Sequence, residues 1–169
     1  MKRLAFALTA GLLLVCAVPT NASAQSVKVG PRATISLGDI SDVGGDLGIG
    51  ANARVGLPSI PVDGHGAFTY YLADENWTVW SLDINAIYPL PVTGPVSPYV
   101  GGGLGITNSS FENTVAGRTT TSSDTDTALN LVGGVEFNAG GLTPFAELNV
   151  GVGGDLSRVG LSGGVLFGF

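Results

Sequence analysis

Apolar and polar residues alternate along most of this chain, and the alternation is clearest at its C-terminal end. Over residues 159–169 the odd positions are mostly aliphatic or aromatic, ending with Phe167 and Phe169, and the even positions are mostly Gly or Ser. A period of two residues is the signature of a β-strand with one apolar face. The chain is therefore predicted to end on such a strand.

The same alternation recurs in seven earlier segments, which are separated by residues typical of turns. With the terminal one, the predicted strands are 27–37, 46–57, 62–72, 79–88, 96–107, 127–138, 145–152 and 159–169. An even number of alternating segments of about ten residues is what an up-and-down transmembrane barrel requires. The fold class predicted is therefore an all-β, eight-stranded antiparallel transmembrane β-barrel with meander order. A β-sandwich that packs the last strand inside is the structural alternative.

The first 25 residues have a different pattern. Lys2 and Arg3 precede an apolar run over 4–18, and the small residues Ala22 and Ala24 flank a cleavage position before Gln25. This three-part pattern predicts a secretory signal peptide over 1–25, followed by the barrel domain over 26–169. Because Cys16, the one cysteine, lies in that signal, no disulfide is expected in the mature protein.

Composition and charge narrow the possible classes of function. The chain is 44% hydrophobic and 12% charged, with 27 glycines, which argues against disorder. Removal of the signal leaves five basic against thirteen acidic residues, a formal charge of −8. A nucleic-acid partner would call for a basic face, and none is predicted.

The connections between the predicted strands fall into two sets that differ in length and charge. If both termini lie on the inner side of a membrane, the outer loops are 38–45, 73–76, 108–125 and 153–157, and the inner turns are 58–61, 89–95 and 138–141. The long break, 108–125, falls in the outer set, as expected for such barrels. The inner turns carry no charged residue. The outer loops carry seven acidic residues: Asp39, Asp42, Asp74, Glu75, Glu112, Asp124 and Asp155.

Charged residues also occur at positions predicted to face the barrel interior. An eight-stranded barrel is just wide enough for side chains to fill it, so these residues predict a network of ion pairs that plugs the lumen. The inward glycines Gly101, Gly103 and Gly105 would make room for long side chains from other strands. A narrow wet path through the network is the alternative. The predicted lumen charge network is Lys28, Arg32, Asp46, Arg54, Asp63, His65, Asp83, Glu136, Glu147 and Arg158.

Catalytic, metal and cofactor sites have little support in the sequence. His65 is the one histidine, so a histidine-rich metal site is excluded, and a catalytic triad would have to combine it with Asp63 and with Ser81 or Ser162. The glycines over 101–105 are not followed by a predicted helix that could hold a phosphate. We expect no enzyme activity and no cofactor.

Four features together resemble one family: the signal peptide, the eight alternating segments, long outer against short inner connections, and an aromatic C-terminus. The chain resembles small bacterial outer-membrane β-barrels of the OmpX-like or OmpA-like porin family. The resemblance implies a monomer in the Gram-negative outer membrane, in contact with lipid and lipopolysaccharide. It also implies that the barrel-assembly machinery recognises the last strand through Val165, Phe167 and Phe169.

The resemblance specifies architecture better than activity. The function expected is structural, a surface-display barrel with a filled lumen and acidic outer loops that serves adhesion or envelope integrity. A narrow passive channel for small solutes is the main alternative. A lipid-active enzyme using His65 and a soluble barrel that holds a ligand are weaker alternatives.

Overall fold

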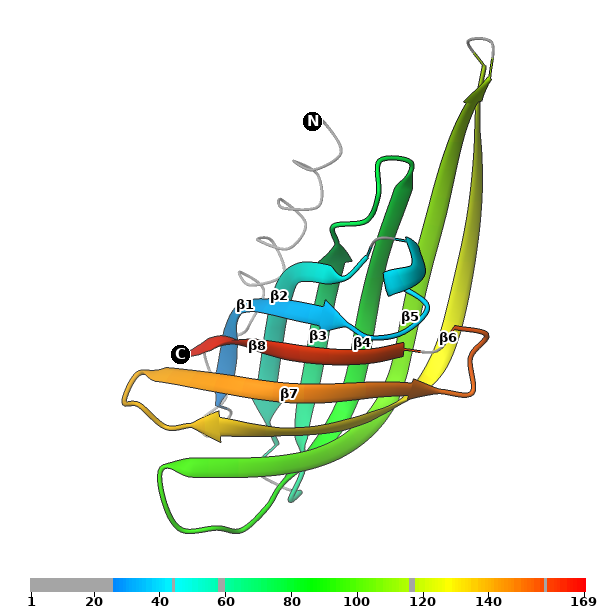
Figure 1. The fold of residues 1–169 in the computed structure, drawn as a ribbon. Coiled ribbons are helices and arrows are strands. Elements are labelled where there is room, and N and C mark those ends of the chain that lie inside the picture. The colour runs from blue at the N-terminus through cyan, green and yellow to red at the C-terminus, as the bar shows by residue number, and fades with distance from the viewer. Residues whose placement is uncertain (1–25, 44, 58–59, 116–117, 157) are drawn as a thin grey trace.

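The computed structural model describes residues 26–43, 45–57, 60–115, 118–156 and 158–169. Within them eight antiparallel strands form one closed barrel in chain order, as predicted, with a short 3-10 helix at Ser41–Val43 (Figure 1). The strands are β1 (Val27–Ser36), β2 (Leu47–Gly56), β3 (Asp63–Tyr71), β4 (Trp77–Pro89), β5 (Val96–Val115), β6 (Arg118–Phe137), β7 (Leu142–Val152) and β8 (Arg158–Gly168). No helix among the described residues is long and apolar enough to cross a bilayer. The predicted signal peptide, 1–25, lies outside the described residues.

Pairing between the first and last strands closes the barrel. β1 pairs with β8 from Lys28 opposite Gly168 to Ser36 opposite Gly160, and the Phe169 N–H donates to the Val27 carbonyl at 3.0 Å. The last strand is therefore paired on both sides and is not an edge. The β-sandwich alternative is wrong, because closing the sheet satisfies this strand without a second layer.

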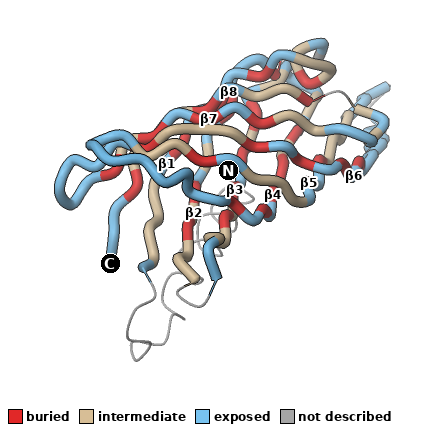
Figure 2. The backbone as a smooth tube through the Cα atoms, turned by 90° about the horizontal axis from the view of Figure 1, so that it is seen from below, coloured by how far each residue is buried: buried red, intermediate tan, exposed pale blue. Residues whose placement is uncertain are grey.

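The predicted inward and outward faces agree with burial along the strands. In β4, for example, Ser81 and Asp83 are buried, whereas Ile84 between Asp83 and Asn85 is 66% exposed (Figure 2). Apolar side chains, most of them aliphatic, stand outward on every strand, so an apolar surface surrounds a polar interior. Such a surface suits hydrocarbon and would be a large exposed patch in water.

The two ends of the barrel differ. At one end, here called the turn end, lie the connections β2–β3, β4–β5 and β6–β7 and the C-terminus; at the other, the hairpin end, β5 and β6 project well beyond the remaining strands (Figure 1). The prediction that 108–125 forms a loop is wrong, because β5 continues to Val115 and β6 begins at Arg118.

Cross-strand contacts explain why this polar segment is a hairpin. Ser110 faces Ser123 with hydroxyl oxygens 2.9 Å apart, and Thr114 faces Thr119 at 3.0 Å. Such hydroxyl pairs stabilise neighbouring strands. Both faces of the segment are polar, so it lacks the alternation that marked the other strands.

Candidate functional site

Polar side chains from all eight strands meet inside the barrel. Each strand contributes at least one that is buried, which follows from the inward register of the alternating pattern. These residues are Arg32, Asn52, His65, Asp83, Thr107, Asn130, Glu147 and Ser162, in strand order.

A chain of hydrogen bonds crosses the interior from β8 to β1; we call it the polar belt and define it as Arg158, Asn130, Asn85, His65, Asn52 and Arg32. At its β8 end the Arg158 Nη2 donates to Asn130 Oδ1 at 2.7 Å and to Asp83 Oδ1 at 2.8 Å. The Asn130 amide donates in turn to Asp83 at 2.8 Å and to Asn85 Oδ1 at 3.2 Å. Asp83 thus receives two donors and neutralises Arg158.

His65 forms the centre of the polar belt. The Asn85 amide lies 3.1 Å from His65 Nδ1, and His65 Nε2 lies 2.9 Å from Asn52 Oδ1. Since the Asn85 amide nitrogen can only donate and the Asn52 amide oxygen can only accept, these contacts fit a neutral imidazole with its proton on Nε2. Arg32 Nη1 then donates to the same Asn52 oxygen at 3.3 Å, and Arg32 also bonds to Ser162.

Glu147 joins the polar belt to a second group of charges nearer the turn end. Its side chain is fully buried and accepts the Tyr99 hydroxyl at 2.9 Å. Arg32 Nη2 lies 3.5 Å and Arg54 Nη2 3.8 Å from its oxygens. The buried carboxylate is therefore surrounded by two guanidinium groups and a phenol, which offset the cost of its burial.

Arg54 and Glu136 extend this group toward the turn end. The Arg54 guanidinium stacks over the Tyr99 ring, 3.9 Å from its centroid, and pairs with Glu136. Lys28 Nζ donates to the other Glu136 oxygen at 3.1 Å. The predicted network of inward charges is thus continuous from Lys28 to Glu147.

Apolar layers lie on either side of these polar groups. Ile87, Tyr99 and Val132 pack together near the turn end, and Tyr71 and Val79 near the hairpin end pack with Ile40. Ile40 comes from the β1–β2 connection and is 3% exposed, so this connection covers the mouth of the barrel.

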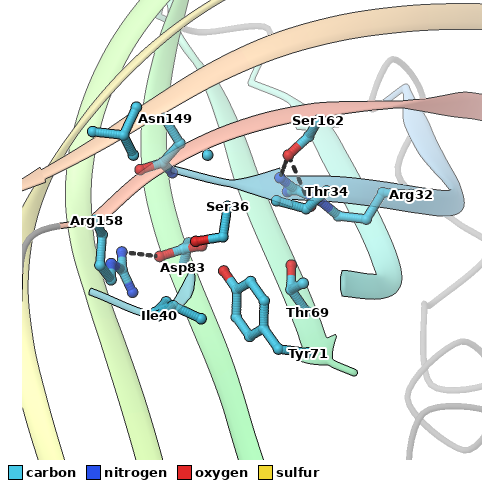
Figure 3. Close-up of a pocket in the computed structure, with 12 residues that line it drawn as sticks. Arg32, Thr34, Ser36, Ile40, Thr69, Tyr71, Asp83, Asn149, Arg158 and Ser162 are labelled. Carbon is cyan, nitrogen blue, oxygen red and sulfur yellow. Dashed lines mark hydrogen bonds and ion pairs between the residues drawn. The ribbon is translucent and has the colours of Figure 1, made fainter. Parts of the chain in front are cut away.

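The space left between these groups is small. Figure 3 shows residues that line a cavity beside Ile40, among them Tyr71, Asp83, Asn149 and Arg158; its volume is about 20 Å³. A cavity of that size holds about one water molecule. Among the described residues, then, this part of the interior is filled by side chains.

The inward glycines make that filling possible, as the sequence indicated. A Cβ at Gly105 would collide with Arg158 and Asp83, and one at Gly134 with the Tyr99 ring. The glycines of β5 and β6 therefore leave the volume that long side chains from other strands occupy.

Two predicted members of the charge network lie apart from it. Asp46 precedes β2 and is exposed, and Asp63 is the half-buried first residue of β3. The described contacts include no ion pair of either carboxylate. Both lie at strand ends, where the barrel opens to solvent.

The triad considered for His65 is not assembled. Both ring nitrogens contact amides of Asn52 and Asn85, whereas the Ser162 hydroxyl contacts Thr34 at 2.9 Å and Arg32. His65 is a buried interior residue whose polar atoms have partners. The residue types of a hydrolytic triad are therefore present, but the described contacts do not bring them together.

Some interior residues could not be predicted as site residues from charge, because they are neutral amides or lie in the polar hairpin segment. Asn52, Asn85 and Asn130 carry the polar belt, and their inward positions in the alternation were the signal available. Asp126 was also missed; it is 8% exposed and accepts the Asp155 N–H at 2.9 Å, which ties the β7–β8 connection to β6.

The three residues predicted as an assembly signal lie on the outward face of β8. Phe167 is 43% and Phe169 82% exposed, and Val165 is partly buried. Phe167 stands between Val29 of β1 and Leu142 of β7 at the turn end. All three side chains thus face away from the interior network.

Three solved structures of bacterial proteins are similar to this chain. The N-terminal β-barrel domain of Pseudomonas aeruginosa OprF is 19% identical, with a TM-score of 0.60, covering 85% of this chain and 97% of that one. Neisserial surface protein A is 19% identical with a TM-score of 0.56, covering 87% and 98%. Ail, the attachment invasion locus protein of Yersinia pestis, is 18% identical with a TM-score of 0.57, covering 86% and 97%.

A comparison with curated proteins found no match. The solved structures share too little sequence to establish more than the fold. The family described as outer membrane protein beta-barrel domain, however, matches residues 9–162, which is most of the sequence. With its closed barrel, apolar outer surface and polar interior, this chain belongs to that family and is a bacterial outer-membrane β-barrel.

Proposed function

We propose that this barrel is a closed structural scaffold that displays the β5–β6 hairpin on the cell surface for adhesion. The observation that carries the proposal is the filled interior, in which the polar belt leaves a cavity of about 20 Å³. A path for a hydrated solute needs far more room than the one water that this volume holds. The scaffold role therefore places function on the outside of the barrel.

The orientation follows from length and charge. The hairpin end carries the long β5–β6 hairpin and the acidic connections, so we assign it to the cell exterior and the short connections to the periplasm. Phe169 then lies on the periplasmic side, where the assembly machinery would meet it. The aliphatic surface contacts lipid, and the outward residues at the rim below the hairpin contact the lipopolysaccharide headgroups. We propose a monomer within its own membrane and no enzyme activity.

A similar protein offers limited support for adhesion. Ail is named an attachment invasion locus protein, and it has also been crystallised with the heparin analogue sucrose octasulfate. Its likeness to this chain shows the fold alone. The adhesive role therefore depends on a direct test of the hairpin.

The test is a shortened hairpin that leaves the barrel intact. Residues 112–121 are replaced by Asn-Gly, a pair that favours a two-residue turn, so that Phe111 still faces Ser122. The Phe111 ring then keeps its packing against Trp77, at 5.0 Å between centroids. We expect the shortened protein to fold, by unboiled gel mobility, and bacteria expressing it to lose attachment to surfaces and to host-cell matrix. Unchanged attachment would contradict the display role.

A narrow passive channel is the second candidate, and buried polar atoms with no described protein partner favour it. These include the Asn149 amide at the cavity and Nε of Arg54, both of which water could satisfy. Conductance of the purified mature chain in a planar bilayer separates the two functions. We expect no discrete steps from folded protein, and reproducible steps would favour the channel.

A further inference from the structure

The part of β6 that projects beyond the barrel is paired on one side only. β5 pairs with β6 along its whole length, but β7 pairs with it only as far as Val152 opposite Leu129. Between Leu129 and the hairpin tip, the β7-facing edge of β6 has one hydrogen-bond partner among the described residues. It is the Asp155 N–H, which donates to the Asp126 side chain. Residues 119–125 thus form a free strand edge.

The register fixes which backbone groups point out of this edge. The Glu112 N–H donates to the Asn76 carbonyl at 2.9 Å, away from β6, so Glu112 and the opposite Thr121 form a pair that is not hydrogen-bonded. Thr121 therefore directs its N–H and C=O toward the free edge. Alternation gives the same direction to Thr119, Ser123 and Thr125.

The edge lacks most of the features that usually prevent strand addition. Natural edges are blunted by Pro, charged side chains, bulges or short length, and of these the edge carries the charges of Asp124 and Asp126. Residues 119–127 contain neither Pro nor Lys, and the β5–β6 register continues without a bulge from Val96 opposite Phe137 to Val115 opposite Arg118. The edge is therefore suited to bind another strand.

Charge indicates which strand it binds. Arg118 and Asp124 are both exposed, lie on one face of β6 and stand too far apart to pair with each other. If a second β6 lies antiparallel with Thr121 opposite Thr121, each Arg118 stands opposite the Asp124 of the other copy. These positions are not hydrogen-bonded in the new pair, which is where opposed side chains approach most closely.

The neighbouring register is less favourable. Shifting the two strands so that Arg118 opposes Asp126 directs the guanidinium at a carboxylate that is 8% exposed and already accepts the Asp155 N–H. The register centred on Thr121 uses the exposed acid instead. It also forms an isologous contact, in which both copies use the same edge.

The direction of β6 determines where the second copy lies. In every copy β6 runs from the hairpin end toward its own barrel, so antiparallel β6 edges belong to barrels that point in opposite directions. Two copies in one membrane point the same way. Antiparallel pairing therefore joins copies in facing membranes.

We propose that the edge of β6 over 119–125 pairs antiparallel with the same edge of a second copy in a facing membrane, with Thr121 at the centre of the contact. This inference rests on the proposed function, since it names the partner of the displayed hairpin. It gives the barrel a homophilic adhesive contact made by backbone hydrogen bonds and two reciprocal Arg118–Asp124 pairs.

Charge exchange in proteoliposomes tests the contact. The mature chain is reconstituted into separate donor-labelled and acceptor-labelled vesicles, and clustering is measured by energy transfer between them. Arg118→Asp or Asp124→Arg alone places like charges opposite each other twice. We expect each variant by itself to need about tenfold more protein for the same clustering as wild type.

The two variants also provide the matched control. Mixing Arg118→Asp vesicles with Asp124→Arg vesicles restores both opposite-charge pairs, and so does the double variant with itself. Clustering should return to the wild-type level in both cases. Failure of the mixture to recover, or no wild-type clustering, would overturn the proposal.

A cysteine at the centre gives an independent test of the register. With the signal removed, Thr121→Cys is the one cysteine in the chain, and in this register it meets its own copy across the contact. We expect oxidation of Thr121→Cys to give a covalent dimer between vesicles. Thr119→Cys would face Ser123, so its yield of covalent dimer should be at least about tenfold lower. Equal yields would overturn the register. Loss of attachment on hairpin shortening without wild-type vesicle clustering would refute this inference and leave the display function standing.

Discussion

Glu147 is the residue on which the interior charges depend most. It is fully buried and shared by Arg32, Arg54 and Tyr99, so its removal leaves two guanidinium groups without their common carboxylate. We expect Glu147→Ala to lower the free energy of unfolding by about 3–5 kcal/mol, measured by urea titration of the protein in lipid with tryptophan fluorescence.

The control for this prediction is an exposed carboxylate. Glu112→Ala on the hairpin should change the free energy of unfolding by less than about 0.5 kcal/mol. Glu147→Gln should fall between the two, because it still accepts the Tyr99 hydroxyl but carries no charge. Equal effects of the two alanine variants would mean that the interior network does not stabilise the barrel.

Gly103 tests whether close packing of the interior matters as much as its charge. A Cβ at this position would lie 2.6 Å from the Asn85 Cα, a backbone atom that cannot rotate away. Gly103→Ala should cost about 1–3 kcal/mol in the same urea titration, as expected for overpacking. Gly133→Ala, where a Cβ meets nothing within 4 Å, should not destabilise the protein. A harmless Gly103→Ala would indicate a looser interior.

Among the elements, the C-terminal end of the chain has two roles that can be tested separately: it closes the barrel, and it is predicted to be recognised by the assembly machinery. Phe169 is 82% exposed, so Phe169→Ala should leave the stability of refolded protein unchanged. If the assembly machinery reads this residue, the same variant should reach the outer membrane of cells in severalfold lower amount. Phe137→Ala, an exposed aromatic of β6 close to the turn end, is the matched control and should assemble normally. Normal assembly of both would argue against an assembly signal at Phe169.

The strands also show which structural features the alternation of residues predicts and which it does not. Alternation placed the inward and outward faces correctly, because lipid on one side and a polar interior on the other impose opposite demands on successive residues. The hairpin was missed, since both faces of 112–115 and 118–125 are exposed and no such demand exists there. The exposed Asp46 and the amides of the polar belt were misjudged because alternation gives a side chain's direction and neither its depth nor its partners.

At the scale of the whole molecule, the apolar surface and the projecting hairpin define two environments along the same strands. Leu131 stands outward from the middle of β6, 58% exposed, between Gly102 and Val150. Thr114 stands on the outward face of the projecting part of β5 and is also exposed. Both side chains point outward, and they differ in their position along the barrel axis.

An arginine at each position therefore measures where the membrane lies. Leu131→Arg should lower the free energy of unfolding in lipid bilayers by about 2–4 kcal/mol, the cost of a base near the midplane. Thr114→Arg should change it by less than about 0.5 kcal/mol, because that side chain remains in water. In a soluble barrel that holds a ligand, water would surround both positions, and neither arginine would matter. The difference between the two variants thus tests the membrane position of the barrel and the exposure of its hairpin together.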